Sequence, residues 1–246
     1  MNRKICLILG SNSEIGQAIA YRFASEGFDL LLASRNPKGY QERLAADLET
    51  RHNIKALPLE FDGSKYDTHQ GFCDGLQPFP DVVISVFGYL GDNKKSISDF
   101  SESHKIIVSN FTGHVSVLNL VAQKMKERKS GSIIGISSVA GERGRAGNLI
   151  YGSAKAAFSA YVDGLRNYLF KSGVYVGTIK PGYVRTKMIE DLDTPSIITA
   201  TSEQVAKAVW KAYKGKKSTV YTLAHWRFIM FILRLIPEFI FKRLSI

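Results

Sequence analysis

Residues 5–16 read ICLILGSNSEIG, and this stretch decides the fold that the rest of the chain completes. Five apolar residues, Ile5 to Leu9, precede a loop that begins at Gly10, and a helical pattern starts near Ile15. A strand followed by a glycine-bearing turn and a helix points backbone N–H groups at an anion. The same loop carries Glu14, a carboxylate at the place where an anion would bind.

Short apolar runs alternate with amphipathic segments along the chain. This alternation predicts parallel strands joined by helices that cover both faces of one sheet. The strands are apolar on both sides, as in the run VVISV at 82–86, which suits a sheet that is buried twice. The predicted strands are 4–9, 28–33, 55–60, 81–86, 131–137, 173–179 and 218–222, and the predicted helices are 15–26, 38–51, 65–75, 101–127, 151–171 and 202–213.

Length and composition favour one large α/β domain with a well-buried core. The chain has 246 residues, 45% of them hydrophobic, and a net charge of +11. Residues 201–246 hold nine basic and two acidic residues, a net charge of +7, which indicates an anionic partner or a solvated basic face. The basic residues do not alternate with exposed aromatic residues, so we expect no nucleic-acid binding.

Cysteine and histidine usage predicts no metal site. Cys6 and Cys73 form no CxxC pair, and the five histidines lack the spacing of metal ligands. Both thiols are expected to pack in the core of a cytoplasmic protein. Because the chain enters its first strand after about four residues, we expect no signal peptide. Because no run approaches the roughly 18 apolar residues of a spanning helix, we expect no membrane span.

The last residues differ in composition from the rest of the chain; they read AHWRFIMFILRLIPEFIFKRLSI (224–246). They predict an apolar and basic helical extension over 223–246, in which Pro237 ends or kinks the first helix. Arg227, Arg234 and Glu238 fall on one side of that helix. Such a helix is typical of contact with a membrane surface or lipid, but packing against its own domain or another subunit remains an alternative.

The residues most specific for chemistry lie within 131–158, GSIIGISSVAGERGRAGNLIYGSAKAAF. Tyr151 and Lys155 are four apart on a predicted helix, so their side chains share one face. A neighbouring ammonium would lower the pKa of a phenol and so favour proton transfer near neutral pH. Ser138, at the end of a strand, would hold the substrate oxygen while Tyr151 transfers the proton.

With these residues the chain resembles the short-chain dehydrogenase/reductase family from about residue 4 to about residue 222. The resemblance implies a Rossmann-type doubly wound sheet of about seven strands over 1–222 and a nicotinamide cofactor at the strand ends. It also implies that Ser138 polarises the substrate oxygen, that Tyr151 is the general acid and base, and that Lys155 binds the nicotinamide ribose. Asn110 would hold a water in the proton relay.

The resemblance also implies the cofactor-binding residues. No acid ends the second strand and Arg35 follows it, which favours NADPH, while NADH remains possible. Two departures from the family pattern are Glu14, in place of a loop glycine, and Val86, in place of an asparagine; we expect Glu14 to point outward. The cofactor-binding residues are Gly10, Asn12, Ser13, Ile15, Gly16, Arg35, Asp62, Gly88, Tyr151, Lys155, Pro181, Gly182, Val184 and Thr186.

These features predict an enzyme that interconverts a ketone and a secondary alcohol by hydride transfer. The run SEIG, the run FGYLGD and the tail resemble the branch that contains the ketone-reducing partner of decaprenylphosphoryl-ribose 2-epimerisation, so a lipid-linked keto sugar is one expected substrate. A soluble ketone, steroid or acyl-carrier substrate is the alternative, and a non-catalytic nucleotide-binding scaffold is a remote one. The resemblance further implies a homodimer or homotetramer, which the tail would hold at the cytoplasmic face of a membrane.

Overall fold

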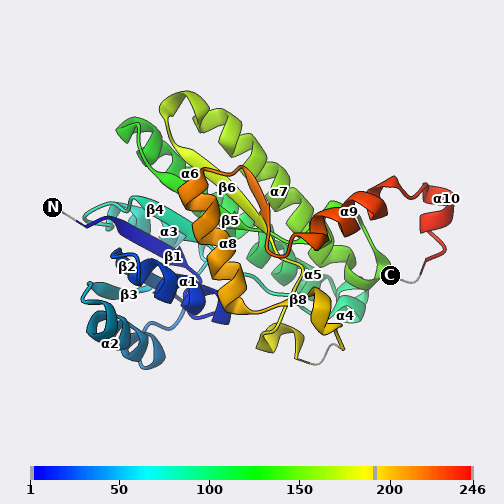
Figure 1. The fold of residues 1–246 in the computed structure, drawn as a ribbon, viewed down its shortest axis with the longest axis horizontal. Helices are drawn as coiled ribbons and strands as arrows, with labels where there is room; N and C mark the ends of the chain where they lie inside the picture. Colours follow the sequence, from blue (N-terminus) through cyan, green and yellow to red (C-terminus); the bar gives the residue numbers. More distant parts are fainter. Residues whose placement is uncertain (1–2, 191–192, 245–246) are drawn as a thin grey trace.

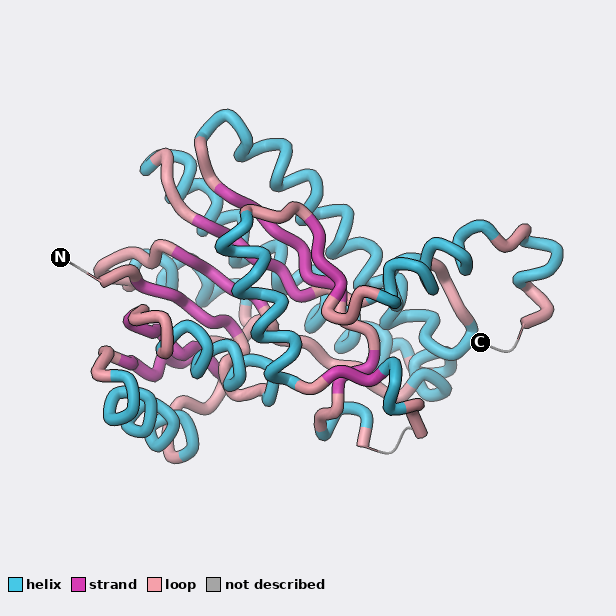
Figure 2. The backbone as a smooth tube through the Cα atoms, viewed as in Figure 1, coloured by secondary structure: helices cyan, strands magenta, loops and turns pink. Residues whose placement is uncertain are grey.

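The structure is a computed structural model that describes residues 3–190 and 193–244. Within these residues a seven-stranded parallel sheet has the order β3-β2-β1-β4-β5-β6-β9, which confirms the predicted fold (Figures 1 and 2). Each predicted strand is present within two residues of its expected bounds. The strands are β1 (Ile5–Leu9), β2 (Asp29–Ser34), β3 (Ala56–Glu60), β4 (Val82–Ser85), β5 (Ser132–Ile136), β6 (Tyr175–Lys180) and β9 (Thr219–Tyr221).

Helices cover both faces of this sheet, as Figure 1 shows. One face packs against α1 (Glu14–Ala24), α2 (Tyr40–His52) and α8 (Ser202–Gly215). The other face packs against α3 (Tyr66–Asp74), α6 (Gly113–Arg128) and α7 (Leu149–Leu169). The sheet is doubly wound because its order reverses between β1 and β4, and in such sheets ligands bind at the strand ends beside that reversal.

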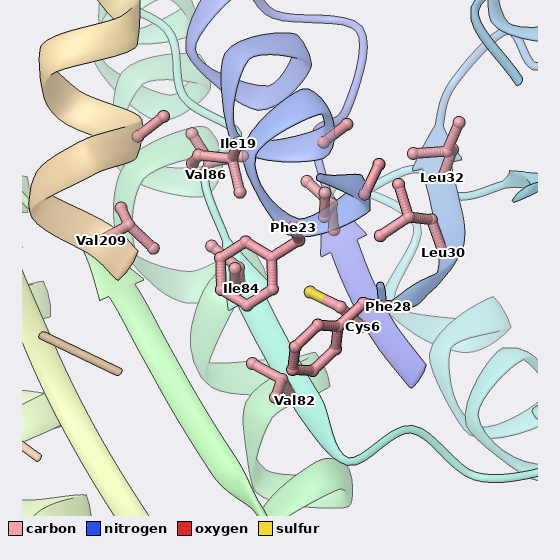
Figure 3. Close-up of a cluster of buried hydrophobic side chains, with 14 of the residues drawn as sticks. Cys6, Ile19, Phe23, Phe28, Leu30, Leu32, Val82, Ile84, Val86 and Val209 are labelled. Carbon is pink, nitrogen blue, oxygen red and sulfur yellow. The ribbon is translucent and has the colours of Figure 1, made fainter. Parts of the chain in front are cut away.

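The core lies between these layers and explains the apolar strands. Alternate residues of β1 enter opposite clusters: Ile8 packs on the α1 side and Leu7 on the α3 side. Phe23 of α1 and Phe28, which precedes β2, make an edge-to-face contact with ring centroids 5.2 Å apart (Figure 3). Because both faces of the strands are buried, their sequences do not alternate between apolar and polar residues.

The longest predicted helix, 101–127, is interrupted by one irregular turn. Helix α5 (Phe100–Ile107) passes through a π-helical turn at Val108–Thr112 before α6 begins. By length and composition this Phe100–Arg128 segment would qualify as a membrane span, contrary to expectation, but half of its most apolar window is buried. Since it packs against α3 and α7, its environment is that of a core helix.

Some short elements were not predicted. Helix α4 (Asn93–Ser98) precedes α5, and a second sheet pairs β7 (Tyr183–Val184) with β8 (Thr199–Ala200). The segment between β7 and β8 contains two 3-10 turns, Lys187–Ile189 and Ser196–Ile198. Residues 191–192 of this segment lie outside the described residues. So do residues 1–2 of the predicted domain 1–222 and residues 245–246 of the predicted extension 223–246.

The C-terminal extension forms α9 (His225–Leu235) and α10 (Glu238–Phe241). Pro237 caps α10, which confirms that it ends the first helix. Figures 1 and 2 show both helices extending away from the sheet at the right of the view. The start of α9 nevertheless contacts the body, because Trp226 and Met230 are buried in a small cluster with Val139.

Candidate active site

Two pockets meet at the carboxyl ends of the strands. The first, of about 430 Å³, is lined by all four predicted catalytic residues, and the second, of about 930 Å³, by the loop after β1 and the end of β2. Phe87 and Gly88 line both pockets. The two pockets therefore adjoin at the place where a doubly wound sheet binds a dinucleotide.

Asn110 lies on the π-helical turn and is fully buried. Its side-chain amide donates to the carbonyl oxygens of Ile106, at 2.8 Å, and Tyr89, at 2.6 Å. The first bond satisfies a carbonyl near the end of α5, just before the irregular turn, and the second ties the turn to the loop after β4. Asn110 thus fixes this wall of the first pocket.

Ser138, Tyr151 and Lys155 come from two elements that pack against each other. Ser138 follows β5, and its hydroxyl accepts the backbone N–H of Ala140 at 3.1 Å. Tyr151 and Lys155 lie one turn apart on α7, and Lys155 donates its Nζ proton to the carbonyl of Ile136 at 3.2 Å. The Lys155 Nζ is 5.9 Å from the centre of the Tyr151 ring.

Burial shifts the pKa values of Tyr151 and Lys155 in opposite directions. Burial raises the pKa of Tyr151 to about 12, against a lowering contribution from the Ser138 hydroxyl. Burial also lowers the pKa of Lys155 to about 7, so this amine is only partly charged at neutral pH. The lowering of the tyrosine pKa by Lys155 stays a prediction.

The loop after β1 has the geometry of an anion-binding turn. Gly10 has φ +97°, and a Cβ at this position would lie 2.6 Å from the backbone nitrogen of Phe87. A Cβ on Gly16 would lie 2.5 Å from the Gly10 carbonyl, so both glycines are required by close approach. Ser13 caps α1 by accepting the Gly16 N–H at 3.1 Å.

Glu14 points away from this loop, as expected. Its carboxylate accepts the backbone N–H of Lys187 at 2.8 Å, in the segment after β7. As the first residue of α1 it also interacts favourably with the helix dipole. The carboxylate therefore joins two loops and leaves the anion-binding turn intact.

At the end of β2, a guanidinium and an unpaired hydroxyl line the second pocket. Arg35 is exposed and lines the pocket beside Ser34, whose buried hydroxyl has no hydrogen-bond partner among the described residues. Asp62 lines the same pocket; burial opposes its ionisation, but hydrogen bonds from Ser64 and the nearby Arg35 lower its pKa. A free hydroxyl next to a guanidinium suits a phosphate group.

The remaining predicted cofactor residues line the two pockets. Asn12 and Ser13 line the second pocket, and Ile15, Val184 and Thr186 line the first. A Cβ on Gly88 would lie 2.8 Å from the Asn110 side chain. A larger residue at position 88 would therefore displace the Asn110 side chain. Pro181 accepts the Val139 N–H at 2.9 Å, which joins the loop after β6 to the Ser138 loop.

Two residues that line the first pocket were missed from the sequence. Trp226 of α9 is 5% exposed, and its indole N–H donates to the Ile198 carbonyl at 3.0 Å. Arg145 lines the same pocket, and its buried Nε has no partner among the described side chains. Since neither belongs to a motif, only the packing of the tail and of the Ser138–Tyr151 loop reveals them.

Two consecutive residues of that loop anchor the tail. Glu142 accepts hydrogen bonds from Lys180, at 2.9 Å, and from Tyr221, at 2.5 Å, and its other oxygen is 3.5 Å from Arg234. Burial opposes the ionisation of Glu142, but these partners lower its pKa. Arg143 donates to the carbonyls of Leu233 and Ile236, pairs with Glu238 at 3.1 Å and lies over the ring of Phe241.

With the fold and the site described, similarity to known proteins defines the class. The short chain dehydrogenase family matches residues 4–196. An uncharacterized oxidoreductase of Mycobacterium tuberculosis, Rv2073c, is 33% identical over 97% of this chain and 96% of its own length. An uncharacterized oxidoreductase of Streptomyces coelicolor is 31% identical over 98% and 95%.

Solved structures share the fold. A short-chain dehydrogenase from Sphingobium yanoikuyae in complex with NADPH has a TM-score of 0.79 at 22% identity, covering 96% of this chain and 97% of its own. A short chain dehydrogenase from Burkholderia cenocepacia in complex with NADP has a TM-score of 0.83 at 17% identity, covering 100% and 98%.

The chain belongs to the short-chain dehydrogenase/reductase family. It is an NAD(P)-dependent oxidoreductase that acts on a carbonyl or alcohol substrate. When bound, the reduced cofactor supplies the hydride to the carbonyl carbon. The Ser138 hydroxyl would hold the substrate oxygen and Tyr151 would donate the proton that this oxygen gains.

Proposed function

We propose that this enzyme reduces a lipid-linked keto sugar to the secondary alcohol with NADPH. The observation that carries the proposal is the lining of the first pocket. Ser138 and Tyr151 line it together with Trp226 of the tail and Arg145 of the adjoining loop. A guanidinium at this pocket suits a phosphorylated sugar, and an apolar helix beside it suits a lipid.

The preference for NADPH is supported by the end of β2. Arg35 and the unpaired hydroxyl of Ser34 both lie at the second pocket, where an NAD-preferring enzyme would have a carboxylate for the ribose 2′-OH. The Arg35 guanidinium would pair with the 2′-phosphate and Ser34 would donate its free proton to it. Neither interaction favours NADH.

A binding titration tests the cofactor proposal. Wild type and Arg35→Ala are titrated with NADPH and with NADH while nicotinamide fluorescence is followed. We expect Arg35→Ala to weaken NADPH binding by about 10-fold or more and NADH binding by less than about threefold, since a charge-assisted bond is lost in only one case. Equal losses for both nucleotides would reject the NADPH preference, and no binding of either would reject the proposed cofactor site.

The substrate proposal is tested by comparing ketones that share one sugar. Reduction of a prenyl-phosphate-linked 2-keto pentose is compared with reduction of the free keto pentose, in wild type and in Arg145→Gln. We expect the variant to raise KM for the phosphate-linked substrate alone. If a soluble steroid or acyl-carrier ketone is reduced faster than either, the alternative substrate class is favoured, with the tail serving only to pack on the body.

Assembly and location remain part of this proposal. The exposed apolar side chains Tyr168 and Phe170 near the end of α7 support a homodimer or homotetramer. The two buried free thiols, Cys6 and Cys73, support a reducing cytoplasm. Light scattering during size-exclusion chromatography would measure the assembly, and a monomer at micromolar concentration would reject it.

A further inference from the structure

Helix α9 has apolar residues on two opposite faces. The face toward the body includes Trp226 and Met230, which are buried, and Leu233, which is half-buried. The other face has apolar residues at spacings of three, four and seven, which place them on one side of a helix. This exposed face consists of Phe228, Phe231, Ile232 and Leu235, all of them more than half exposed.

Helix α10 continues the exposed apolar surface. Phe239 is 63% exposed, and Ile240 and Leu244 are each more than two-fifths exposed, whereas Phe241 is buried beneath Arg143. We call the seven exposed residues the tail face: Phe228, Phe231, Ile232, Leu235, Phe239, Ile240 and Leu244. Seven large apolar side chains within 17 residues exceed the scattered exposure that is normal for a monomer.

Basic side chains flank the tail face. Arg227 and Arg234, seven residues apart, lie along one edge of α9, and Lys242 and Arg243 follow α10; all four are exposed. The one carboxylate between residues 224 and 244, Glu238, is paired with Arg143 at 3.1 Å. The surface around the tail face is therefore strongly cationic.

The body holds the tail face outward. Glu142 accepts two hydrogen bonds from the body and faces Arg234, and Arg143 binds the carbonyl end of α9. These contacts all use the flank and the end of α9, so they fix the helix without covering its exposed face. Figure 1 shows α9 and α10 projecting from the rest of the molecule.

We propose that the tail face docks on an anionic lipid bilayer, with its apolar side chains at the acyl boundary and its basic residues on the headgroups. This proposal rests on the proposed function, because a lipid-linked substrate is what requires the enzyme to work at a bilayer. Anionic headgroups would complement the cationic flank. A second copy of this chain would instead bring the same arginines and lysines face to face in a two-fold contact.

Docking would also place the reaction pocket beside the lipid. Trp226 lines that pocket from the body side of the same helix whose opposite side forms the tail face. Met188 lines the pocket and is 46% exposed at its rim. The keto sugar of a lipid-linked substrate could then enter the pocket while its lipid stays in the bilayer.

Vesicle flotation tests the proposal. The full chain is mixed with vesicles of phosphatidylglycerol and phosphatidylcholine in equal amounts, or of phosphatidylcholine alone, at physiological salt. We expect binding to the anionic vesicles, weakened at least about 10-fold by Phe231→Ser with Leu235→Ser, because two apolar side chains that would enter the bilayer are lost. Arg227→Gln is expected to weaken it about fivefold.

A matched control carries the same chemical change elsewhere. Leu57→Ser, on β3 at the edge of the sheet opposite β9, removes one exposed apolar side chain of the body and should change vesicle binding less than twofold, and Leu235→Ser alone is its counterpart on the tail face. Equal binding of wild type to both vesicle types, or none to either, would overturn the proposal. So would an oligomer that Phe231→Ser with Leu235→Ser dissociates, because the tail face would then be a subunit interface.

An NADPH titration of the same samples separates the two proposals. Retained NADPH binding in the tail variant shows that the domain is folded, so a loss of flotation belongs to the tail face. Flotation of a wild type that binds no nucleotide would reject the proposed function while leaving the docking surface in place.

Discussion

The indole of Trp226 packs directly on the backbone of Gly182. A Cβ on Gly182 would come within 2.0 Å of the ring, so no larger residue fits there while α9 is docked. Gly182 belongs to the loop after β6 that lines the reaction pocket, and Trp226 lines the same pocket from the tail. The C-terminal extension therefore completes the site that the sheet begins.

Removing this indole should loosen the tail and the pocket together. We expect Trp226→Ala to lower the free energy of unfolding by about 3–5 kcal/mol, as for other buried aromatic truncations, and to weaken substrate binding more than turnover. Urea denaturation and a comparison of KM with kcat measure the two effects. Trp210→Ala, at the other tryptophan, should destabilise without a selective effect on KM; equal KM changes would contradict a role in the pocket.

We propose the phenol of Tyr151 as the proton donor of the proposed reduction. Tyr151→Phe should lower the reduction rate by about 10²- to 10⁴-fold, the usual contribution of a positioned acid, while NADPH affinity changes less than about twofold. Steady-state rates with a test ketone and a fluorescence titration measure the two quantities. Tyr161→Phe, on the same helix, loses a hydrogen bond to Asn119 and should keep its rate. Comparable losses in both variants would assign the effect to helix packing.

The buried Lys155 makes stability depend on pH. Its pKa is about 7 in the folded chain against an ordinary value of 10.5, so between these values the unfolded chain binds the extra proton. Stability should therefore rise with pH in this window, by up to about 1.4 kcal/mol per pH unit, and the full penalty applies below pH 7.

Lys155→Met should abolish this rise, and Lys171→Met, at an exposed lysine, should preserve it. Urea denaturation at pH 7.5, 8.5 and 9.5 measures the slope for each protein. A wild-type slope equal to that of Lys155→Met would show that the amine is charged when folded.

Glu14 holds the segment after β7 without entering the anion-binding loop. Glu14→Gln keeps an acceptor for the Lys187 N–H and should leave NADPH affinity within about twofold, because no charge repels the phosphates in wild type. Isothermal titration calorimetry with NADPH measures the affinity. A 10-fold tighter complex in Glu14→Gln would place the carboxylate near the pyrophosphate instead.

The sequence by itself determined the sheet, its helices and the common helix face of the candidate catalytic residues. Apolar runs such as Ile5–Leu9 can be buried on both faces only in a covered parallel sheet, and the spacing of four between Tyr151 and Lys155 fixes their common helix face. These are local properties of the chain, set by the periods of strand and helix. The sequence predicts the position of Asn110 in an irregular helical turn less directly. Its two carbonyl partners can be identified only in the folded structure.

Tertiary structure alone decided which groups surround that site. Trp226 and Gly182 are separated by 44 positions in the sequence, and only the docking of α9 brings them together. The direction of the Tyr151 pKa likewise follows from burial, which the spacing to Lys155 does not contain. Both results depend on packing between distant segments, whereas helix and strand periodicity describes only near neighbours.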